Sequence, residues 1–262
     1  MITRDIGMPR IVHNSYPFTM TELLNPGKSG EFELVKTIIP VGKEFRLYDR
    51  SGRVFTGKYT FDYPTVILKQ QGIAWMSDSQ LEIGSVEGAV SAAKGNCLIS
   101  GLGIGLLPTL IKDLEVVRSI DIVELRQEVI DLVFHQIKNE KMNIFKGDIF
   151  SYLETTDKKY DFIHIDIWKN ITATIKEIDK AREAAQRCLN PDGIIWCWLQ
   201  ELYDRIKDRL PKAPVSPGSA GKYEPCLICG KTVRYDYAGL CVACATGMGV
   251  NELYLKGRPE KE

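Results

Sequence analysis

The chain has 262 residues, of which 44% are hydrophobic and 26% charged, and its 34 basic and 34 acidic residues give a formal net charge of zero. This composition is typical of a globular protein with ample length for a core, and the balanced charge disfavours a protein that coats nucleic acid by bulk electrostatics. No apolar run is long enough for a membrane span, and the first residues lack the apolar segment of a signal peptide. We therefore expect an intracellular, cytoplasmic protein.

The amino-terminal part, residues 1–72, is predicted to form an irregular arm followed by a small antiparallel β subdomain. The arm contains scattered prolines and a short helix near residues 19–24. From residue 31 onward, short β-rich segments are separated by turn sequences at residues 40–42, 49–52 and 70–72. Short strands joined by such turns are typical of hairpins.

A strand, a glycine-rich turn and a helix follow one another in the segment CLISGLGIGLLP, residues 97–108. Glycines stand at alternate positions, Gly101, Gly103 and Gly105. A direct turn from a parallel strand into a helix needs backbone angles or close approaches that a Cβ would obstruct. The start of the helix offers unpaired N–H groups to an anionic or polar ligand group. The segment predicts a ligand site, with an ordinary loop as the alternative.

The next predicted strand ends at Glu124. An acidic residue at the tip of the second strand, roughly 20 residues after the turn, is placed to accept hydrogen bonds from ribose hydroxyls. The alternative is a helix N-cap or a solvated loop acid. Later strands are predicted to end at Asp148 and Asp166, and a long amphipathic helix leads to a last strand. This alternation of strands and helices predicts a doubly wound parallel α/β sheet over residues 73–210.

Five motifs in this order resemble those of class I S-adenosylmethionine-dependent methyltransferases: GLGIG, the strand-end Glu124, GDIFSYL, YDFIHIDIW and LNPDGIIW. With its β-rich leader the chain looks most like the spermidine-synthase-like branch, a Rossmann-like fold, and the resemblance covers about residues 65–200. It implies S-adenosylmethionine as cofactor. The three glycines would approach its amino-acid and ribose portions, Glu124 would hold the ribose hydroxyls, and Asp148 with Ile149 would flank the adenine.

The same resemblance implies an acceptor site at the carboxyl ends of the strands. Asp166 would act there as a base or orient the acceptor, or else contact the amine of the cofactor without a catalytic duty. Trp168 would form an apolar wall. Asp78 and Glu82, in the segment that joins the β subdomain to the cofactor site, would face the pocket, with a helix cap as the alternative for Asp78. For His164, on the same side of its strand as Asp166, we expect a packed core position.

We expect a methyltransferase whose acceptor the sequence does not identify. An aminopropyltransferase of the polyamine-synthase kind is the first alternative, but those enzymes carry an acid where this chain has Ile104, and a second Asp after the strand-end Asp, where residues 169–170 hold no acid. A protein that binds the cofactor without catalysis and docks through its carboxyl-terminal module is the other alternative. No DPPY- or NPPY-type tetrapeptide follows the fourth strand, which disfavours methylation of adenine amino groups in nucleic acid.

After a Pro-, Ser- and Gly-rich linker at residues 211–222, the module at residues 223–262 carries four clustered cysteines, Cys226, Cys229, Cys241 and Cys244. Two Cys-x2-Cys pairs have the spacing of metal knuckles, and four thiolates satisfy a closed tetrahedral Zn²⁺ site. We expect a zinc-ribbon-like module that is stabilised by its metal. Two disulfides, the alternative, conflict with an intracellular location. The near-balanced charge of the module favours a structural or protein-contacting role over a nucleic-acid contact. The sequence leaves the oligomeric state of the chain open, and a homodimer is one possibility.

Overall fold

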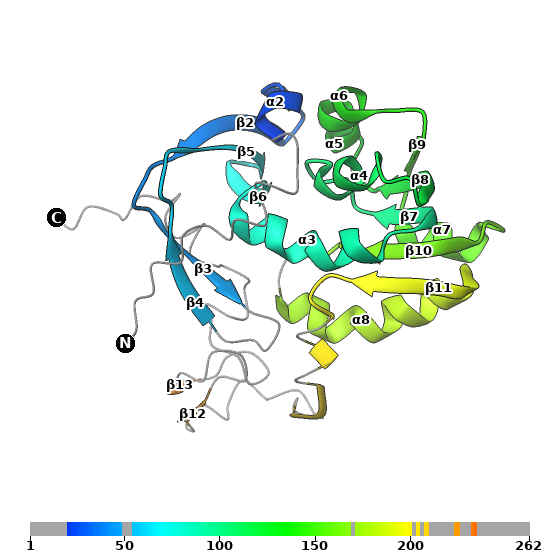
Figure 1. Cartoon of the computed structure of the whole chain (residues 1–262). Coiled ribbons are helices and arrows are strands. Elements are labelled where there is room, and N and C mark those ends of the chain that lie inside the picture. The colour runs from blue at the N-terminus through cyan, green and yellow to red at the C-terminus, as the bar shows by residue number, and fades with distance from the viewer. Residues whose placement is uncertain are drawn as a thin grey trace.

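The computed structural model of the chain describes residues 20–48, 54–168, 171–200, 203–204, 207–209, 223–225 and 232–234. A five-stranded parallel sheet carries helices on both faces, and a four-stranded antiparallel sheet lies beside it (Figure 1). These two parts confirm the expected α/β core with an amino-terminal antiparallel subdomain. Within the described ranges, no helix is long and apolar enough to cross a membrane.

The parallel sheet has the strand order β11-β10-β7-β8-β9, and all neighbouring strands run parallel. In chain order its strands are β7 (Gly95–Ser100), β8 (Val117–Glu124), β9 (Met142–Lys146), β10 (Tyr160–Ile165) and β11 (Leu189–Cys197). The order reverses between β7 and β10. Open α/β sheets bind their ligands at the carboxyl ends of the strands beside such a reversal, so the topology itself marks the place of a site.

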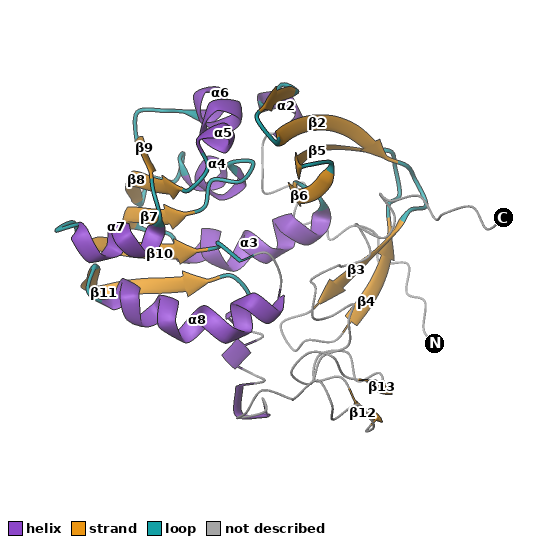
Figure 2. Cartoon of the chain, turned by 180° about the vertical axis from the view of Figure 1, so that it is seen from behind, coloured by secondary structure: helices purple, strands orange, loops and turns teal. Residues whose placement is uncertain are grey.

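Helices pack on both faces of the parallel sheet (Figure 2). One face is covered by α3 (Gln80–Ala92), α4 (Leu106–Ile111), α5 (Gln127–Val129), η1 (Ile130–Phe134) and α6 (His135–Ile137). The other face is covered by α7 (Ile149–Thr155) and α8 (Ile171–Gln186). Successive residues of β7 alternate between the two apolar clusters, with Cys97 and Ile99 in the first and Leu98 in the second. Strands that are buried on both faces consist of continuous apolar runs, and these runs allowed the strands to be predicted from the sequence.

The antiparallel sheet follows the short helix α2 (Met20–Leu23) and has the order β1-β2-β5-β6. Its strands are β1 (Gly27–Ser29), β2 (Phe32–Ile39), β5 (Tyr63–Gln70) and β6 (Ile73–Ser77), while β3 (Glu44–Tyr48) and β4 (Val54–Lys58) form a separate hairpin between β2 and β5. Gln71 and Gly72, with φ of 51° and 80°, make the predicted hairpin turn. Because β6 pairs with β5, this sheet extends beyond the predicted boundary at residue 72.

Two elements differ from the sequence-based expectation. Strand β9 ends at Lys146, so Asp148 lies at the start of α7 rather than at a strand end. The helix expected after Glu124 is interrupted by the π-helical turn η1. In this turn the carbonyl of Leu132 accepts a hydrogen bond from Gln136 Nε2 at 2.6 Å. Beyond β11, the described residues include η2 (Lys207–Arg209) and the paired strands β12 (Tyr223–Pro225) and β13 (Thr232–Arg234).

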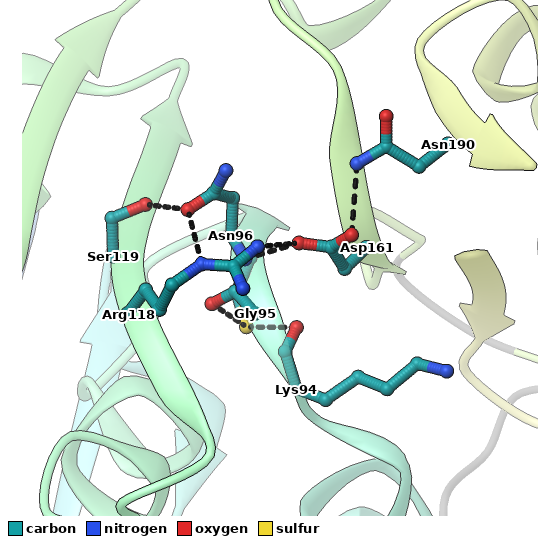
Figure 3. A network of polar contacts seen from close by, with 8 residues as sticks. Lys94, Gly95, Asn96, Arg118, Ser119, Asp161 and Asn190 are labelled. Atoms are coloured by element: carbon teal, nitrogen blue, oxygen red, sulfur yellow. Dashed lines mark hydrogen bonds and ion pairs between the residues drawn. The ribbon is translucent and has the colours of Figure 1, made fainter. Parts of the chain in front are cut away.

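A polar network ties together the amino ends of four core strands (Figure 3). The carboxylate of Asp161 accepts hydrogen bonds from the Asn96 amide, the Arg118 guanidinium and the Asn190 side chain at 2.7, 2.7 and 2.8 Å. The Asn96 amide, with smaller contributions from Asn190 and Arg118, lowers the pKa of Asp161. A Cβ at Gly95, where φ is 61°, would lie 2.0 Å from an Asp161 oxygen, so the network needs glycine there. The network lies at the amino ends of the strands, whereas the expected ligand site lies at their carboxyl ends. Its role is therefore structural.

Candidate active site

The glycine-rich turn leaves β7 beside the strand reversal, and each of its glycines is required for a different contact. Gly101, Gly103 and Gly105 have φ of 86°, 52° and 74°, which L side chains rarely adopt. A Cβ at Gly101 would lie 2.5 Å from the carbonyl oxygen of Asp166. At Gly103 it would meet the sulfur of Met76 at 2.2 Å, and at Gly105 the Ile137 side chain at 2.3 Å. The turn is thus enclosed by β10, the antiparallel sheet and α6.

Glu124 ends β8 next to this turn and is 7% exposed. Its Oε2 accepts a hydrogen bond from the Leu102 amide at 2.7 Å, and its Oε1 accepts one from the Arg126 amide at 2.8 Å. Two backbone donors therefore fix the orientation of the carboxylate. Each oxygen retains a lone pair, so the group can still accept hydrogen bonds from two neighbouring hydroxyls. The structure brings Glu124 and the glycine turn together, as the sequence predicted.

The residues expected around an adenine occupy different environments. Asp148 is exposed and caps α7, because its Oδ1 accepts the Ser151 amide at 3.0 Å. Ile149 is buried in the apolar cluster on the α8 side of the sheet. Leu125, which the sequence analysis did not single out, is 57% exposed directly after Glu124. Its position after a strand-end acid is the signal that could have indicated an apolar surface at this edge.

Two carboxyl groups interact electrostatically on the other side of the turn. Asp166 directly follows β10, and its amide donates to the Ser100 carbonyl at 3.3 Å. Burial raises the pKa of Asp166 to about 7. Burial, with a smaller contribution from the charge of Asp166, raises the pKa of Glu82 in α3 to about 8. Both side chains are partly exposed. With these raised pKa values, one carboxylate and one carboxylic acid can coexist near neutral pH.

His164 lies two residues before Asp166 on β10 and is 4% exposed. Its ring stacks on Phe162, with 6.5 Å between ring centroids and 21° between planes. Burial lowers the pKa of His164 to about 3, so the imidazole stays neutral. Its Nδ1 is buried without a hydrogen-bond partner among the described residues. This placement agrees with the core position that we expected.

Asp78 and Trp168, the residues predicted to line a substrate pocket, are both tied to other protein groups. Asp78 is buried, and its Oδ1 accepts hydrogen bonds from the Thr65 hydroxyl at 2.6 Å and the Val66 amide at 2.8 Å. Trp168 is 9% exposed within the cluster under α8, and its indole N–H donates to Glu177 at 3.0 Å. The structure therefore places Asp78 at the junction of the antiparallel sheet with α3, and Trp168 on the far side of the sheet from α3.

Residues 82–203 match the family model of the spermine/spermidine synthase domain. No curated protein sequence matches the chain. Among solved structures, the chain is similar to spermidine synthase from Thermotoga maritima, with 14% identity, a TM-score of 0.42, and coverage of 72% of this chain and 63% of that one. It is also similar to human methyltransferase-like protein 13 in complex with SAH, with 17% identity, a TM-score of 0.34, and coverage of 43% and 61%. The chain thus spans less than two thirds of either structure, and the fold assignment rests on its own strand order.

Proposed function

We propose that the chain is an S-adenosylmethionine-dependent methyltransferase whose acceptor binds beside Asp166 and Glu82. The observation that carries the proposal is the convergence of three features at the carboxyl edge of the sheet: the glycine turn, the oriented carboxylate of Glu124, and Asp166. A Cβ at Gly101 would lie 2.5 Å from the carbonyl oxygen of Asp166, so the turn lies directly beside Asp166. A ligand held by the turn and by Glu124 would therefore present its far end to Asp166.

The residues present fit S-adenosylmethionine, which would supply a methyl group activated by a sulfonium. Glu124 retains acceptor capacity for the two ribose hydroxyls. The exposed side chain of Leu125 offers an apolar surface for the purine. Because Gly101 and Gly103 have no Cβ, the turn lies close against Asp166 and Met76. Its backbone would then hold the amino-acid portion.

In this proposal Asp166 removes a proton from the acceptor. Methyl transfer forms a bond from an acceptor lone pair to the methyl carbon while the carbon–sulfur bond breaks and its electron pair stays on sulfur. Positioning in line supplies much of the rate. A proton released by the acceptor passes to the Asp166 carboxylate, whose pKa near 7 suits a base at neutral pH. Glu82, which interacts with Asp166, would hold a polar group of the acceptor.

Aminopropyl transfer from decarboxylated S-adenosylmethionine is the second candidate. The family match over residues 82–203 favours it. Glu82 also provides a second carboxyl group that interacts with Asp166, which the sequence around residues 169–170 does not provide. Against it, the position where the polyamine synthases carry an acid in the glycine turn is Ile104, which is fully buried here. Methyl transfer therefore remains the first proposal.

Calorimetric binding of S-adenosylmethionine, its decarboxylated form and NAD to the purified chain tests both candidates. We expect a preference for S-adenosylmethionine that Glu124→Ala abolishes. Glu115→Ala is the matched control, because Glu115 is exposed just before the opposite end of β8, and it should leave binding unchanged. A preference for the decarboxylated donor would establish the second candidate instead. Binding of none of the three would refute both, and binding without methylation of any acceptor pool would indicate a non-catalytic protein.

We also propose that the four clustered cysteines, which lie outside the described residues, bind one structural Zn²⁺. The support is their Cys-x2-Cys spacing in the sequence. In this proposal the metal stabilises the carboxyl-terminal module and takes no part in the transfer reaction.

A further inference from the structure

The turn that follows Glu124 is fastened to the antiparallel sheet through Arg126. The amide of Arg126 is one of the two donors to Glu124. Its guanidinium pairs with Glu31, in the turn just before β2, and lies 5.4 Å from the centre of the Phe32 ring. One residue therefore contacts the ribose-binding acid with its backbone and the other sheet with its side chain. Phe32 in turn packs edge-to-face on Trp75 of β6, with 6.2 Å between ring centroids.

Glu31 is held in place from the opposite side by the turn between β5 and β6. Its Oε1 accepts a hydrogen bond from Gln70, and its Oε2 accepts one from Gln71 at 2.8 Å. The Gln70 bond, followed by the Gln71 bond and the charge of Arg126, lowers the pKa of Glu31. The carboxylate is thus ionised at neutral pH and has three side-chain partners. An isolated surface ion pair restrains its two side chains only weakly. Here Glu31 has further hydrogen bonds and Arg126 an aromatic contact, so both side chains are held in place.

A second line of contacts holds the same end of the antiparallel sheet against the helices after Glu124. The Asn25 amide donates to Gln136 Oε1 at 2.7 Å, and Gln136 also donates to the Leu132 carbonyl in the π-helical turn. A Cβ at Gly27 would lie 3.2 Å from the Leu132 side chain, and one at Gly30 would lie 3.0 Å from that of Glu128. The sheet therefore docks along α5, η1 and α6, and the Glu31–Arg126 pair lies at the end of this interface nearest to Glu124.

We propose that Glu31 and Arg126 are positioning residues that set the affinity of Glu124 for ribose hydroxyls, and that they couple docking of the antiparallel sheet to nucleoside binding. The inference rests on the proposed function, because it requires a nucleoside at Glu124. Without its guanidinium contacts, the Arg126 backbone keeps only the hydrogen bonds that its carbonyl accepts from the Val129 and Ile130 amides. We therefore expect one of the two donors that orient Glu124 to be held less firmly. By linkage, a ligand that needs Glu124 in its observed orientation also stabilises the docked sheet.

A double-mutant cycle with Glu31→Gln, Arg126→Gln and the double variant tests the coupling. We expect either single change to raise the Kd of S-adenosylhomocysteine about three- to thirtyfold, the range that coupling networks give. The double variant should lose no more than the singles, because the two residues act through one contact. The matched control is Glu44→Gln, which removes an exposed ion pair with Lys58 on the β3–β4 hairpin and should leave the Kd unchanged.

The 2′,3′-dideoxyribose analogue of S-adenosylhomocysteine distinguishes positioning from a merely structural role. It lacks both hydroxyls that Glu124 would hold, so its Kd should change less than twofold in the Glu31 and Arg126 variants. In addition, S-adenosylhomocysteine should slow amide hydrogen exchange of β1 and β2 in the wild-type chain but not in Arg126→Gln. Equal losses for both ligands, additive losses in the double variant, or unchanged exchange would overturn the inference. Failure of the wild-type chain to bind either ligand would instead refute the proposed function.

Discussion

At the scale of single residues, the distinctive feature is the pair of carboxyl groups from Asp166 and Glu82. Because their pKa values are raised to about 7 and about 8, the first proton leaves the pair near neutral pH, and the deprotonated base forms as the pH rises. We expect kcat/KM for methyl transfer to rise through pH 7. We expect Asp166→Asn to lower kcat by about 10²- to 10⁴-fold, the usual contribution of a general base, and to abolish the rise.

The measurement is kcat/KM against pH for the wild-type chain, for Asp166→Asn and for Glu82→Gln. Glu82→Gln should keep the rise near pH 7, since burial, not Glu82, raises the pKa of Asp166. Asp166→Asn should still bind S-adenosylmethionine, because Glu124 and the glycine turn are untouched. If Asp166→Asn retained full turnover and the same pH profile, Asp166 would not be the catalytic base and would only contact the cofactor.

The sequence predicted Glu124 and Asp166 because each directly follows an apolar strand, and strand ends define the site of an α/β sheet. It also placed Glu82 at the pocket, but it did not predict the electrostatic interaction of Glu82 with Asp166, since this depends on how α3 lies across the sheet. Nor did it predict the side-chain contacts of Arg126, which depend on the docking of another sheet. Trp168 was expected at the pocket from its position after Asp166, but its side chain packs under α8.

At the scale of secondary-structure elements, one carboxylate, that of Asp161, joins four strands of the parallel sheet. It lies at the start of β10 and accepts hydrogen bonds from residues near the amino ends of β7, β8 and β11. We expect Asp161→Ala to lower the free energy of unfolding by about 1–3 kcal/mol at pH 7, because it leaves donors of Asn96 and Asn190 without their partner. Urea denaturation measures this loss. Asp157→Ala, at an exposed acid in the preceding loop, should have little effect.

The same prediction has a pH dependence with a definite sign. The pKa of Asp161 is lower in the folded chain than its ordinary value of 3.8, so its stabilisation is present above that value and is lost as the pH falls through the folded pKa. The difference between the wild-type chain and Asp161→Ala should therefore shrink below about pH 4. A difference that stays constant down to pH 3 would contradict the role given to the ionised carboxylate.

At the scale of the whole molecule, the order of the motifs along the chain was sufficient to predict the doubly wound core and the antiparallel leader. The partners of the leader strands were not predictable, because turn signals show where strands end and not which strands pair. Thus β2 pairs with β5 across the inserted β3–β4 hairpin. The π-helical turn was also missed, since the apolar spacing of residues 127–137 is compatible with an ordinary helix.

The carboxyl-terminal module is the remaining unit, and its proposed metal can be tested on the full chain. We expect elemental analysis to find about one zinc ion per chain, as four thiolates in this spacing bind one ion. Cys229→Ser should lose the zinc, whereas Cys188→Ala, at a buried free thiol in the core, should retain it. Chelation should then make the four clustered cysteines accessible to alkylation without a reductant, because the metal and not a covalent bond protects them. Protection that only a reductant removes, with no zinc bound, would establish two disulfides instead and would also contradict the expected reducing compartment.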